Sequence, residues 1–215
     1  MDSAYNILYK LVALIIRVIC RINGGLDIKG RENIPSNEGA IIASNHISYL
    51  DPPVIGAVLP RRGVFMARKG LFDIPLLGWM IKRAAFPVDR EKTGPSTIKA
   101  AIKKLKDGEL VIMFPEGKRS ETGQLLEAKR GIGMVAGLSK APIVPTVVVG
   151  TNKALPVNVK WLKRARIKVV FGRPIYYTPT IDGKSQRGHL LHEHISNTIM
   201  TAIGELKNNY SDKSC

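Results

Sequence analysis

Short apolar runs alternate with segments of helical periodicity along most of this chain, and this alternation restricts the fold more than any other feature. The apolar runs indicate buried strands at residues 39–44, 63–67, 85–88, 110–114, 143–149 and 166–171. The helical segments lie at residues 52–59, 96–105, 131–138 and about 184–207. Because strands that alternate with helices build layered domains, the sequence predicts one α/β domain with a mixed, largely parallel sheet flanked by helices. Pro87 favours an edge position for the strand at 85–88.

The N-terminal segment, residues 4–22, is strongly apolar and would form a helix about 28 Å long at ~1.5 Å per residue. Its four polar groups, Asn6, Lys10, Arg17 and Arg21, fall on one stripe roughly 60° wide. In a membrane-spanning helix, two of these cations would lie in hydrocarbon, and each would cost about 2.5–3.5 kcal/mol of insertion free energy. We therefore predict an amphipathic helix in the membrane interface, with packing on the protein's own core and true spanning as the alternatives.

The size of the chain limits it to one substantial core. Its 215 residues, 45% of them hydrophobic, suffice for one α/β domain but make a second independent core improbable. We assign residues 1–23 to the membrane-associating helix and residues 24–215 to the α/β domain. The two cysteines give neither a disulfide framework nor a metal spacing, which fits a reducing compartment.

The chain is strongly basic, with 33 basic and 17 acidic residues and a net charge of +16. No acidic residue occurs between Ala128 and Ile181. Such a surface favours polyanions, meaning nucleic acid, anionic lipid headgroups or an acidic carrier protein, although a solvated basic face is the alternative reading. Aromatic content of 6% and the lack of a nucleic-acid-binding motif argue against nucleic acid, so we expect an anionic membrane surface as partner.

His46 and Asp51 lie between a predicted buried strand and the helix that begins near Pro52. Positions 46 and 51 would be about 140° apart on a helix, so the two side chains can meet only if residues 46–50 form a turn. In such a turn Asp51 would cap the helix and also orient the imidazole as a base for a substrate hydroxyl. A structural histidine with a simple helix cap is the alternative.

Cations and a Glu-Gly turn follow other predicted strands. Glu116, Gly117 and Arg119 come after the strand at 110–114, Arg68 follows the strand at 63–67, and Arg90 follows the strand at 85–88. Ligands of α/β sheets gather at the carboxyl ends of strands, and arginine binds phosphate bidentately. These positions predict one anion-binding cleft, the alternative being basic surface turns.

Two other features carry weaker predictions. The apolar segment at residues 71–81 is either a core helix or a lipid-facing segment. His189, His192 and His194 lie near one another in the sequence, but they have no cysteine or acidic cluster to complete a site, so we predict no metal.

Four segments in order resemble motifs of the 1-acyl-sn-glycerol-3-phosphate acyltransferase family, the lysophosphatidic acid acyltransferases. Residues 45–51 match the NHxSxxD pattern, and residues 86–90 resemble the motif in which an arginine follows an apolar strand. Residues 114–120 match FPEGTRS except for Lys118 in place of threonine, and residues 143–145 resemble the fourth motif. The resemblance covers about residues 40–150.

The resemblance implies an acyl transfer without a cofactor. His46, held by Asp51, would deprotonate the free 2-hydroxyl of lysophosphatidic acid for attack on an acyl thioester of acyl carrier protein or coenzyme A. Phosphatidic acid would be the product. One alternative keeps this chemistry but takes glycerol 3-phosphate or a lysophospholipid as the acceptor. The other is a protein without catalytic activity, a basic module that binds membranes or nucleic acid.

The resemblance also implies roles for the other predicted site residues. Arg90 and Arg119 would hold the substrate phosphate, and Glu116 and Gly117 would shape the acceptor pocket. Arg68 would steady the thioester oxyanion. Together with the N-terminal helix, these roles predict a peripheral, monotopic enzyme on the cytoplasmic face of the cell membrane.

Overall fold

The computed structural model describes residues 2–68, 70, 73, 85–88, 94–157, 159, 161–177, 180–181, 184–185 and 188–211, with only the backbone given at residues 2–6, 68, 86–88, 180–181, 184–185 and 211. Its elements in chain order are α1 (Asp2–Ile22), β1 (Leu26–Lys29), the 3-10 turn η1 (Arg31–Asn33), β2 (Ala40–Ser44), α2 (Asp51–Val58), β3 (Gly63–Arg68), β4 (Ala85–Val88), α4 (Pro95–Lys106), β5 (Leu110–Met113), α5 (Arg130–Ser139), β6 (Ile143–Val149), α6 (Thr151–Ala154), β7 (Ile167–Phe171), β8 (Thr180–Ile181), β9 (Lys184–Ser185) and α7 (His189–Ser211).

Seven of the described strands form one sheet in the order β1-β7-β6-β2-β5-β3-β4. Every pairing in it is parallel except that of β6 with β7, so β1 and β7 run against the other five strands. The prediction of a mixed, largely parallel sheet is therefore confirmed. Strand β4, which carries Pro87, lies at the edge as expected, where a residue without an N–H costs no ladder hydrogen bond.

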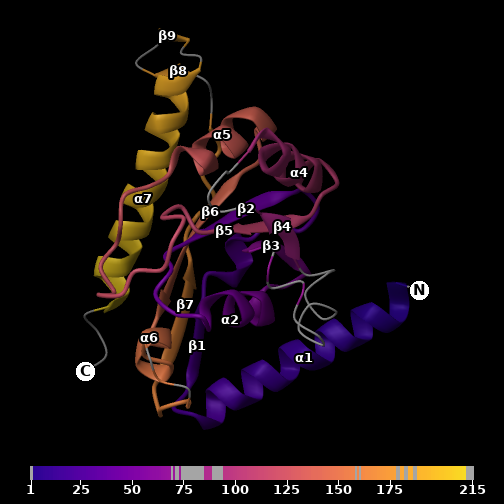
Figure 1. The fold of residues 1–215 in the computed structure, drawn as a ribbon, viewed down its shortest axis with the longest axis vertical. Helices are drawn as coiled ribbons and strands as arrows, with labels where there is room; N and C mark the ends of the chain where they lie inside the picture. The colour runs from indigo at the N-terminus through magenta and orange to yellow at the C-terminus, as the bar shows by residue number, and fades with distance from the viewer. Residues whose placement is uncertain are drawn as a thin grey trace.

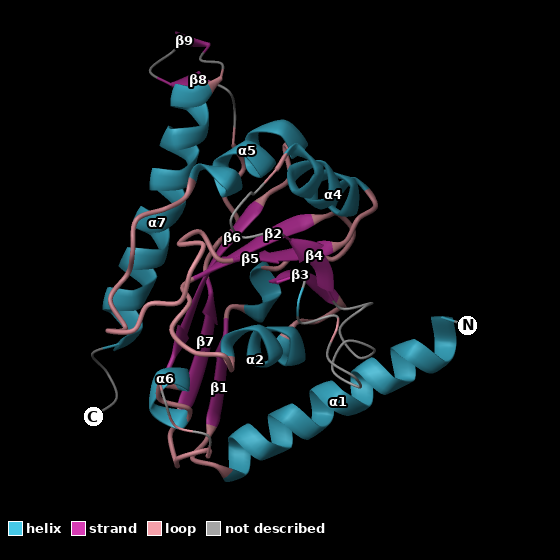
Figure 2. Ribbon diagram, viewed as in Figure 1, coloured by secondary structure: helices cyan, strands magenta, loops and turns pink. Residues whose placement is uncertain are grey.

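Helices cover both faces of this sheet and produce three layers (Figures 1 and 2). Successive residues of a strand point to opposite faces, and both faces of β2 are fully buried. Ile41 belongs to the core that packs under α4, α5 and α7, whereas Ile42 belongs to the core under α1, α2 and α6. Burial on both faces explains why β2, β5 and β6 are continuous apolar runs rather than alternating ones.

Helix α1 divides its surface into three parts. One side packs on α2, where the Tyr9 hydroxyl donates to the Gly56 carbonyl at 2.9 Å and Cys20 is buried. A second side carries the predicted polar stripe. A third side leaves large apolar side chains 41–79% exposed, namely Ile7, Leu11, Leu14, Ile15, Val18, Ile19 and Ile22. Packing on the protein's own core is thus combined with an outward apolar face.

No helix within the described part of the chain has the length and hydropathy needed to cross a membrane.

The structure departs from the predicted elements at β1 and at the start of α7. Strand β1 was not predicted, because charges interrupt its four residues and it pairs only with β7 at the sheet edge. The last helix begins at His189 instead of residue 184, since residues 184–185 pair with residues 180–181 in a short hairpin. The apolar segment at residues 71–81 lies outside the described residues except for Asp73.

We expect the buried face of β2 to control stability. Replacing Ile42, which is 0% exposed, by alanine leaves a cavity beneath α2, and the free energy of unfolding should fall by about 2–5 kcal/mol. The matched Ile42→Val change removes one methyl group and should cost about 0.5–1.5 kcal/mol. Urea denaturation of the three proteins measures both values. Equal stability of all three would show that β2 is not in the packed core.

Candidate active site

The parallel strands bring the predicted site residues to one edge of the sheet. Because β2, β3, β4, β5 and β6 all run in the same direction, their carboxyl ends meet at the same edge. His46 follows β2, residues 114–120 follow β5, and Thr151 follows β6. Arg68 is the last residue of β3, described by its backbone, and Arg90 lies outside the described residues.

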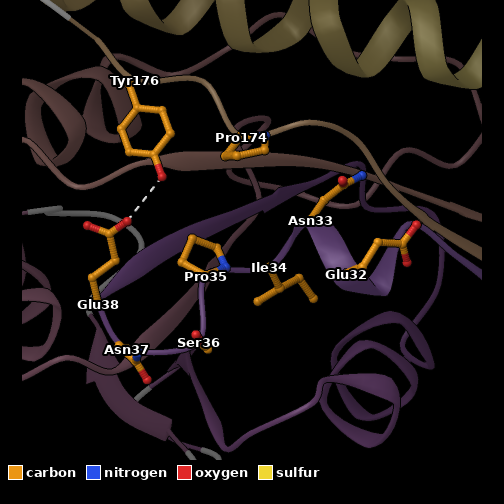
Figure 3. Close-up of a pocket in the computed structure, with 9 residues that line it drawn as sticks. All are labelled: Glu32, Asn33, Ile34, Pro35, Ser36, Asn37, Glu38, Pro174 and Tyr176. Atoms are coloured by element: carbon orange, nitrogen blue, oxygen red, sulfur yellow. Dashed lines mark hydrogen bonds between the residues drawn. The ribbon is translucent and has the colours of Figure 1, made fainter.

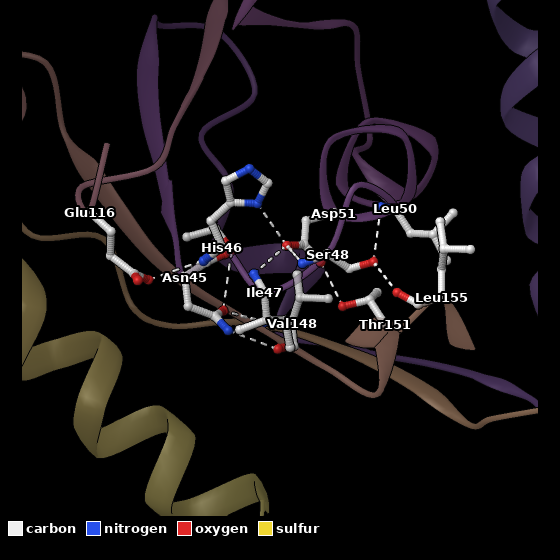
Figure 4. A network of polar contacts seen from close by, with 11 residues as sticks. Asn45, His46, Ile47, Ser48, Leu50, Asp51, Glu116, Val148, Thr151 and Leu155 are labelled. Atoms are coloured by element: carbon white, nitrogen blue, oxygen red, sulfur yellow. Dashed lines mark hydrogen bonds and ion pairs between the residues drawn. The ribbon is translucent and has the colours of Figure 1, made fainter. Parts of the chain in front are cut away.

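The carboxylate of Asp51 is fully buried and is the centre of the polar network in Figure 4. Its Oδ2 atom accepts from the Ile47 amide at 2.7 Å and the Ser48 amide at 2.8 Å, and it lies 2.9 Å from Nδ1 of His46. Its Oδ1 atom accepts from the Thr151 hydroxyl at 2.6 Å. A buried carboxylate requires such compensation, and four donors supply it.

These contacts show what kind of turn precedes α2. The predicted meeting of His46 and Asp51 is confirmed, since residues 46–50 fold back over the start of the helix. The expectation that Asp51 caps α2 is wrong. Its oxygens accept from amides before the helix, Leu50 occupies the N-cap position, and no side-chain cap is present there among the described residues. Proline near the start of α2 leaves fewer N–H groups that need a cap.

The network fixes the orientation of the His46 imidazole. Because the carboxylate can only accept, Nδ1 carries the proton and Nε2 is the basic nitrogen. The ring of Phe114 stacks on the imidazole, with 4.2 Å between ring centroids and 22° between planes. Nε2 makes no hydrogen bond within the described residues, and the ring in Figure 4 turns this nitrogen away from the network. The site therefore holds an oriented imidazole whose second nitrogen has no partner among the described residues.

The segment after β5 holds His46 through its backbone. Glu116 is 1% exposed; its Oε1 accepts from the His46 amide at 3.1 Å and its Oε2 from the Leu126 amide at 3.2 Å. The Ser120 amide donates to the His46 carbonyl at 2.7 Å. Burial raises the pKa of the Glu116 carboxyl, an effect that the two amide hydrogen bonds oppose. Glu116 and Ser120 thus hold the backbone of His46 at both its amide and its carbonyl.

Gly117 and Arg119 lie at the outside of this segment. Gly117 has φ 68°, and a Cβ there would come within 3.0 Å of the Lys129 side chain, so both the turn and the space favour glycine. The guanidinium of Arg119 lies over the ring of Tyr49, 3.9 Å from its centroid. Its Nε is buried without a hydrogen-bond partner in the described part of the chain. Arg119 thus packs against Tyr49 and keeps one buried N–H without a partner.

Two polar residues act here that the sequence did not single out for these roles. The side-chain amide of Asn45 donates to the Val148 carbonyl at 3.0 Å and accepts from the Val148 amide at 2.8 Å, which extends the pairing of β2 with β6. Thr151 closes the network by its bond to Asp51. The available signal was position, because Thr151 comes directly after Gly150, which follows the predicted strand at 143–149.

A surface hollow of about 580 Å³ lies at the opposite edge of the sheet (Figure 3). It is lined by residues 32–38 with Pro174 and Tyr176, and the Tyr176 hydroxyl donates to Glu38 at 3.1 Å. It contains none of the predicted site residues. The described residues also include no cluster of three or more histidine, cysteine or acidic side chains arranged to hold a metal ion.

Comparison with solved structures shows the same fold. The crystal structure of the 1-acyl-sn-glycerophosphate (LPA) acyltransferase PlsC from Thermotoga maritima superposes with a TM-score of 0.77. The match covers 96% of this chain and 82% of that chain, at 24% sequence identity.

Sequence comparison identifies the family of the chain. A family model described as Acyltransferase matches residues 25–149. The 1-acyl-sn-glycerol-3-phosphate acyltransferase of Bacillus subtilis is 37% identical over 79% of this chain and 83% of its own length. The enzyme of that name from Streptococcus pneumoniae is 34% identical over 77% of this chain and 61% of its own length. The chain therefore belongs to the 1-acyl-sn-glycerol-3-phosphate acyltransferase family.

Proposed function

We propose that this protein transfers a fatty acyl group from an acyl thioester to the 2-hydroxyl of 1-acyl-sn-glycerol 3-phosphate, giving phosphatidic acid. The observation that carries the proposal is the 2.9 Å contact of His46 Nδ1 with the buried Asp51, which leaves Nε2 as an oriented base. The names of the similar enzymes from Bacillus and Streptococcus support the same acceptor. Acyl carrier protein and coenzyme A are the two donors that the basic surface suits.

In the proposed reaction Nε2 of His46 removes the proton of the acceptor hydroxyl as its oxygen attacks the thioester carbonyl. The carbonyl π electrons move to oxygen, and a tetrahedral oxyanion forms. When that intermediate collapses, the C–S bond breaks, and the departing thiolate takes the proton from the imidazolium. Asp51 stabilises the imidazolium without itself taking the proton, because Thr151 and two amides keep its oxygens occupied. No acyl-enzyme is required.

We assign the contacts with the substrate's charges to three arginines. Arg119 is half-buried beside the segment that holds the His46 backbone, and a guanidinium there suits a phosphate oxygen. We assign the same ligand to Arg90 and the thioester oxyanion to Arg68, both from the sequence resemblance. Glu116 and Gly117 shape the pocket indirectly, by holding the backbone turn after β5.

The outward apolar face of α1 supports a membrane location for the enzyme. The exposed side chains from Ile7 to Ile22 form one continuous helical stripe beside the polar stripe, which is the surface of an interfacial helix. An enzyme bound in this way meets its lipid acceptor in the plane of the bilayer. We propose a peripheral position, with the cytoplasmic face as the predicted side.

Replacing His46 by alanine tests the proposed base. Loss of general-base catalysis should lower turnover of lysophosphatidic acid by about 10²–10⁴-fold, while vesicle binding stays as in the wild type. The protein should still fold, as circular dichroism checks, but at a lower unfolding temperature, because Asp51 loses one of its four donors. The matched control is His189→Ala, since His189 lies exposed at the start of α7. Product formation is followed by thin-layer chromatography with labelled acceptor and each donor.

Near-wild-type turnover by the His46→Ala protein would refute the proposed mechanism. Turnover of glycerol 3-phosphate but not of lysophosphatidic acid by the wild-type protein would instead retain the mechanism and change the acceptor.

Thr151 should act as a positioning residue for Asp51. The Thr151→Val change keeps the shape of the side chain but leaves Oδ1 of a buried carboxylate unpaired, so kcat should fall by roughly tenfold. Because Thr151 donates its hydrogen bond to Asp51 and has no proposed substrate contact, KM for lysophosphatidic acid should stay constant. Thr151→Ser restores the hydroxyl and should recover kcat. Equal kcat values for the valine and serine variants would contradict this role.

Leu11 tests the membrane face of α1. Its side chain is 51% exposed on the apolar stripe, and Leu11→Asp should weaken co-sedimentation with anionic vesicles by about tenfold or more. Leu138→Asp is the matched control, because Leu138 is 55% exposed on α5, on the other face of the sheet. Equal vesicle binding by the two variants would show that α1 does not contact the membrane.

A further inference from the structure

The loop between α6 and β7 exposes two large apolar side chains in succession. Trp161 is 81% exposed and Leu162 is 48% exposed. Tryptophan is seldom so exposed on a soluble surface, and the proposed reaction gives neither side chain a role. A pair of this kind points to a contact with something outside the chain.

The fold fastens this loop to the end of α1. The side chain of Asn23 donates to the Lys163 carbonyl at 2.8 Å, and the Ala165 amide donates to the Asn23 carbonyl at 2.9 Å. A Cβ on Gly24 would lie 2.6 Å from the Ala165 carbonyl oxygen, so glycine is what allows this close approach. The Lys163 amide also donates to the Ala154 carbonyl at 2.8 Å. The loop is thus held in place at its base.

The loop lies beside the end of α1 that carries exposed Ile22. Ile22, the last residue of α1, is 79% exposed and directly precedes the Asn23 that binds the loop. Figure 1 shows the chain between α6 and β7 beside the C-terminal end of α1. Apolar groups from two distant parts of the sequence therefore lie at one end of the molecule.

Free cations accompany these apolar groups. Arg21, Lys163 and Arg164 are exposed and form no ion pair within the described residues. Arg166 differs, because it pairs with Asp27 at 2.9 Å. Tryptophan at the boundary and cations around it are the composition of surfaces that enter the headgroup region of anionic bilayers.

We propose that residues 161–164 form a second membrane-contact site, in which Trp161 and Leu162 enter the headgroup region of an anionic bilayer while Lys163 and Arg164 bind lipid phosphates. The proposal rests on the membrane location proposed for α1. The loop site would extend the membrane contact past the end of α1, and β7 joins the loop to the sheet. An acidic protein would also suit the cations, but the neighbouring apolar stripe of α1 favours a bilayer.

Fluorescence of Trp161 tests the insertion directly. The chain has two tryptophans, Trp79 and Trp161, so a full-length Trp79→Phe protein reports on the loop alone. With vesicles of phosphatidylglycerol and phosphatidylcholine, its emission should shift to the blue, and brominated lipid should quench it. Unchanged emission of protein that co-sediments with these vesicles would overturn the loop site while leaving the location of α1 intact.

Vesicle binding by loop variants gives an independent measurement, because it does not require the Trp79→Phe change. Trp161→Ala should weaken binding to the anionic vesicles about tenfold or more. The double change Lys163→Gln with Arg164→Gln should also weaken binding by roughly tenfold or more, and its effect should vanish at high salt. Lys103→Gln with Lys106→Gln removes the same charge from exposed positions on α4 and should leave binding unchanged.

Three results would contradict the proposal. Equal losses in the loop and α4 double variants would mean that only net charge matters. A wild-type protein that fails to bind anionic vesicles would remove both the loop site and the membrane location of α1. A blue shift of Trp161 on addition of soluble acyl carrier protein, without one on addition of vesicles, would make the loop a protein-docking site.

Discussion

The buried carboxylate of Asp51 is the constraint on which the site depends. A charge that is 0% exposed is tolerated only where donors surround it, and the four donors here come from the turn after β2 and from the start of α6. Satisfying one carboxylate therefore fixes the turn, the imidazole and the approach of β6 to β2 together. The chemistry of the site and the local fold share a single electrostatic requirement.

At the carboxyl ends of the parallel strands, the residues that position His46 differ from the residue to which we assign substrate binding. Buried polar side chains such as Asn45, Glu116 and Thr151 make their bonds to the backbone or to Asp51, and they hold the base in place. Arg119 is half-buried at the same end of the strands and is the residue to which we assign the substrate phosphate. In the proposed reaction, this separation lets a basic surface attract anionic substrates while the His46 ring stays in a low-dielectric, ordered setting.

Most of the fold was predictable because its central strands are buried on both faces and so appear in the sequence as continuous apolar runs. Strand β1 was missed because its residues, Leu26–Lys29, are short and mixed with charges, and because its partner β7 lies some 140 residues away, a separation that no local pattern reveals. The turn at His46 followed from residue types that favour turns. The roles of Thr151 and Asn45 did not, since both depend on the register of β2 with β6. The sequence did not show that α1 packs one side on α2 and leaves another apolar side exposed, because this depends on how the helix packs in the fold.

Nitrogen NMR of the protein labelled at histidine shows whether Asp51 sets the position of the proton on the His46 ring. Near neutral pH the neutral His46 ring should carry its proton on Nδ1 and show an unprotonated Nε2, and Asp51→Asn should disturb that preference. A His46 ring protonated on Nε2 in the wild-type protein, or a tautomer unaffected by Asp51→Asn, would contradict the account.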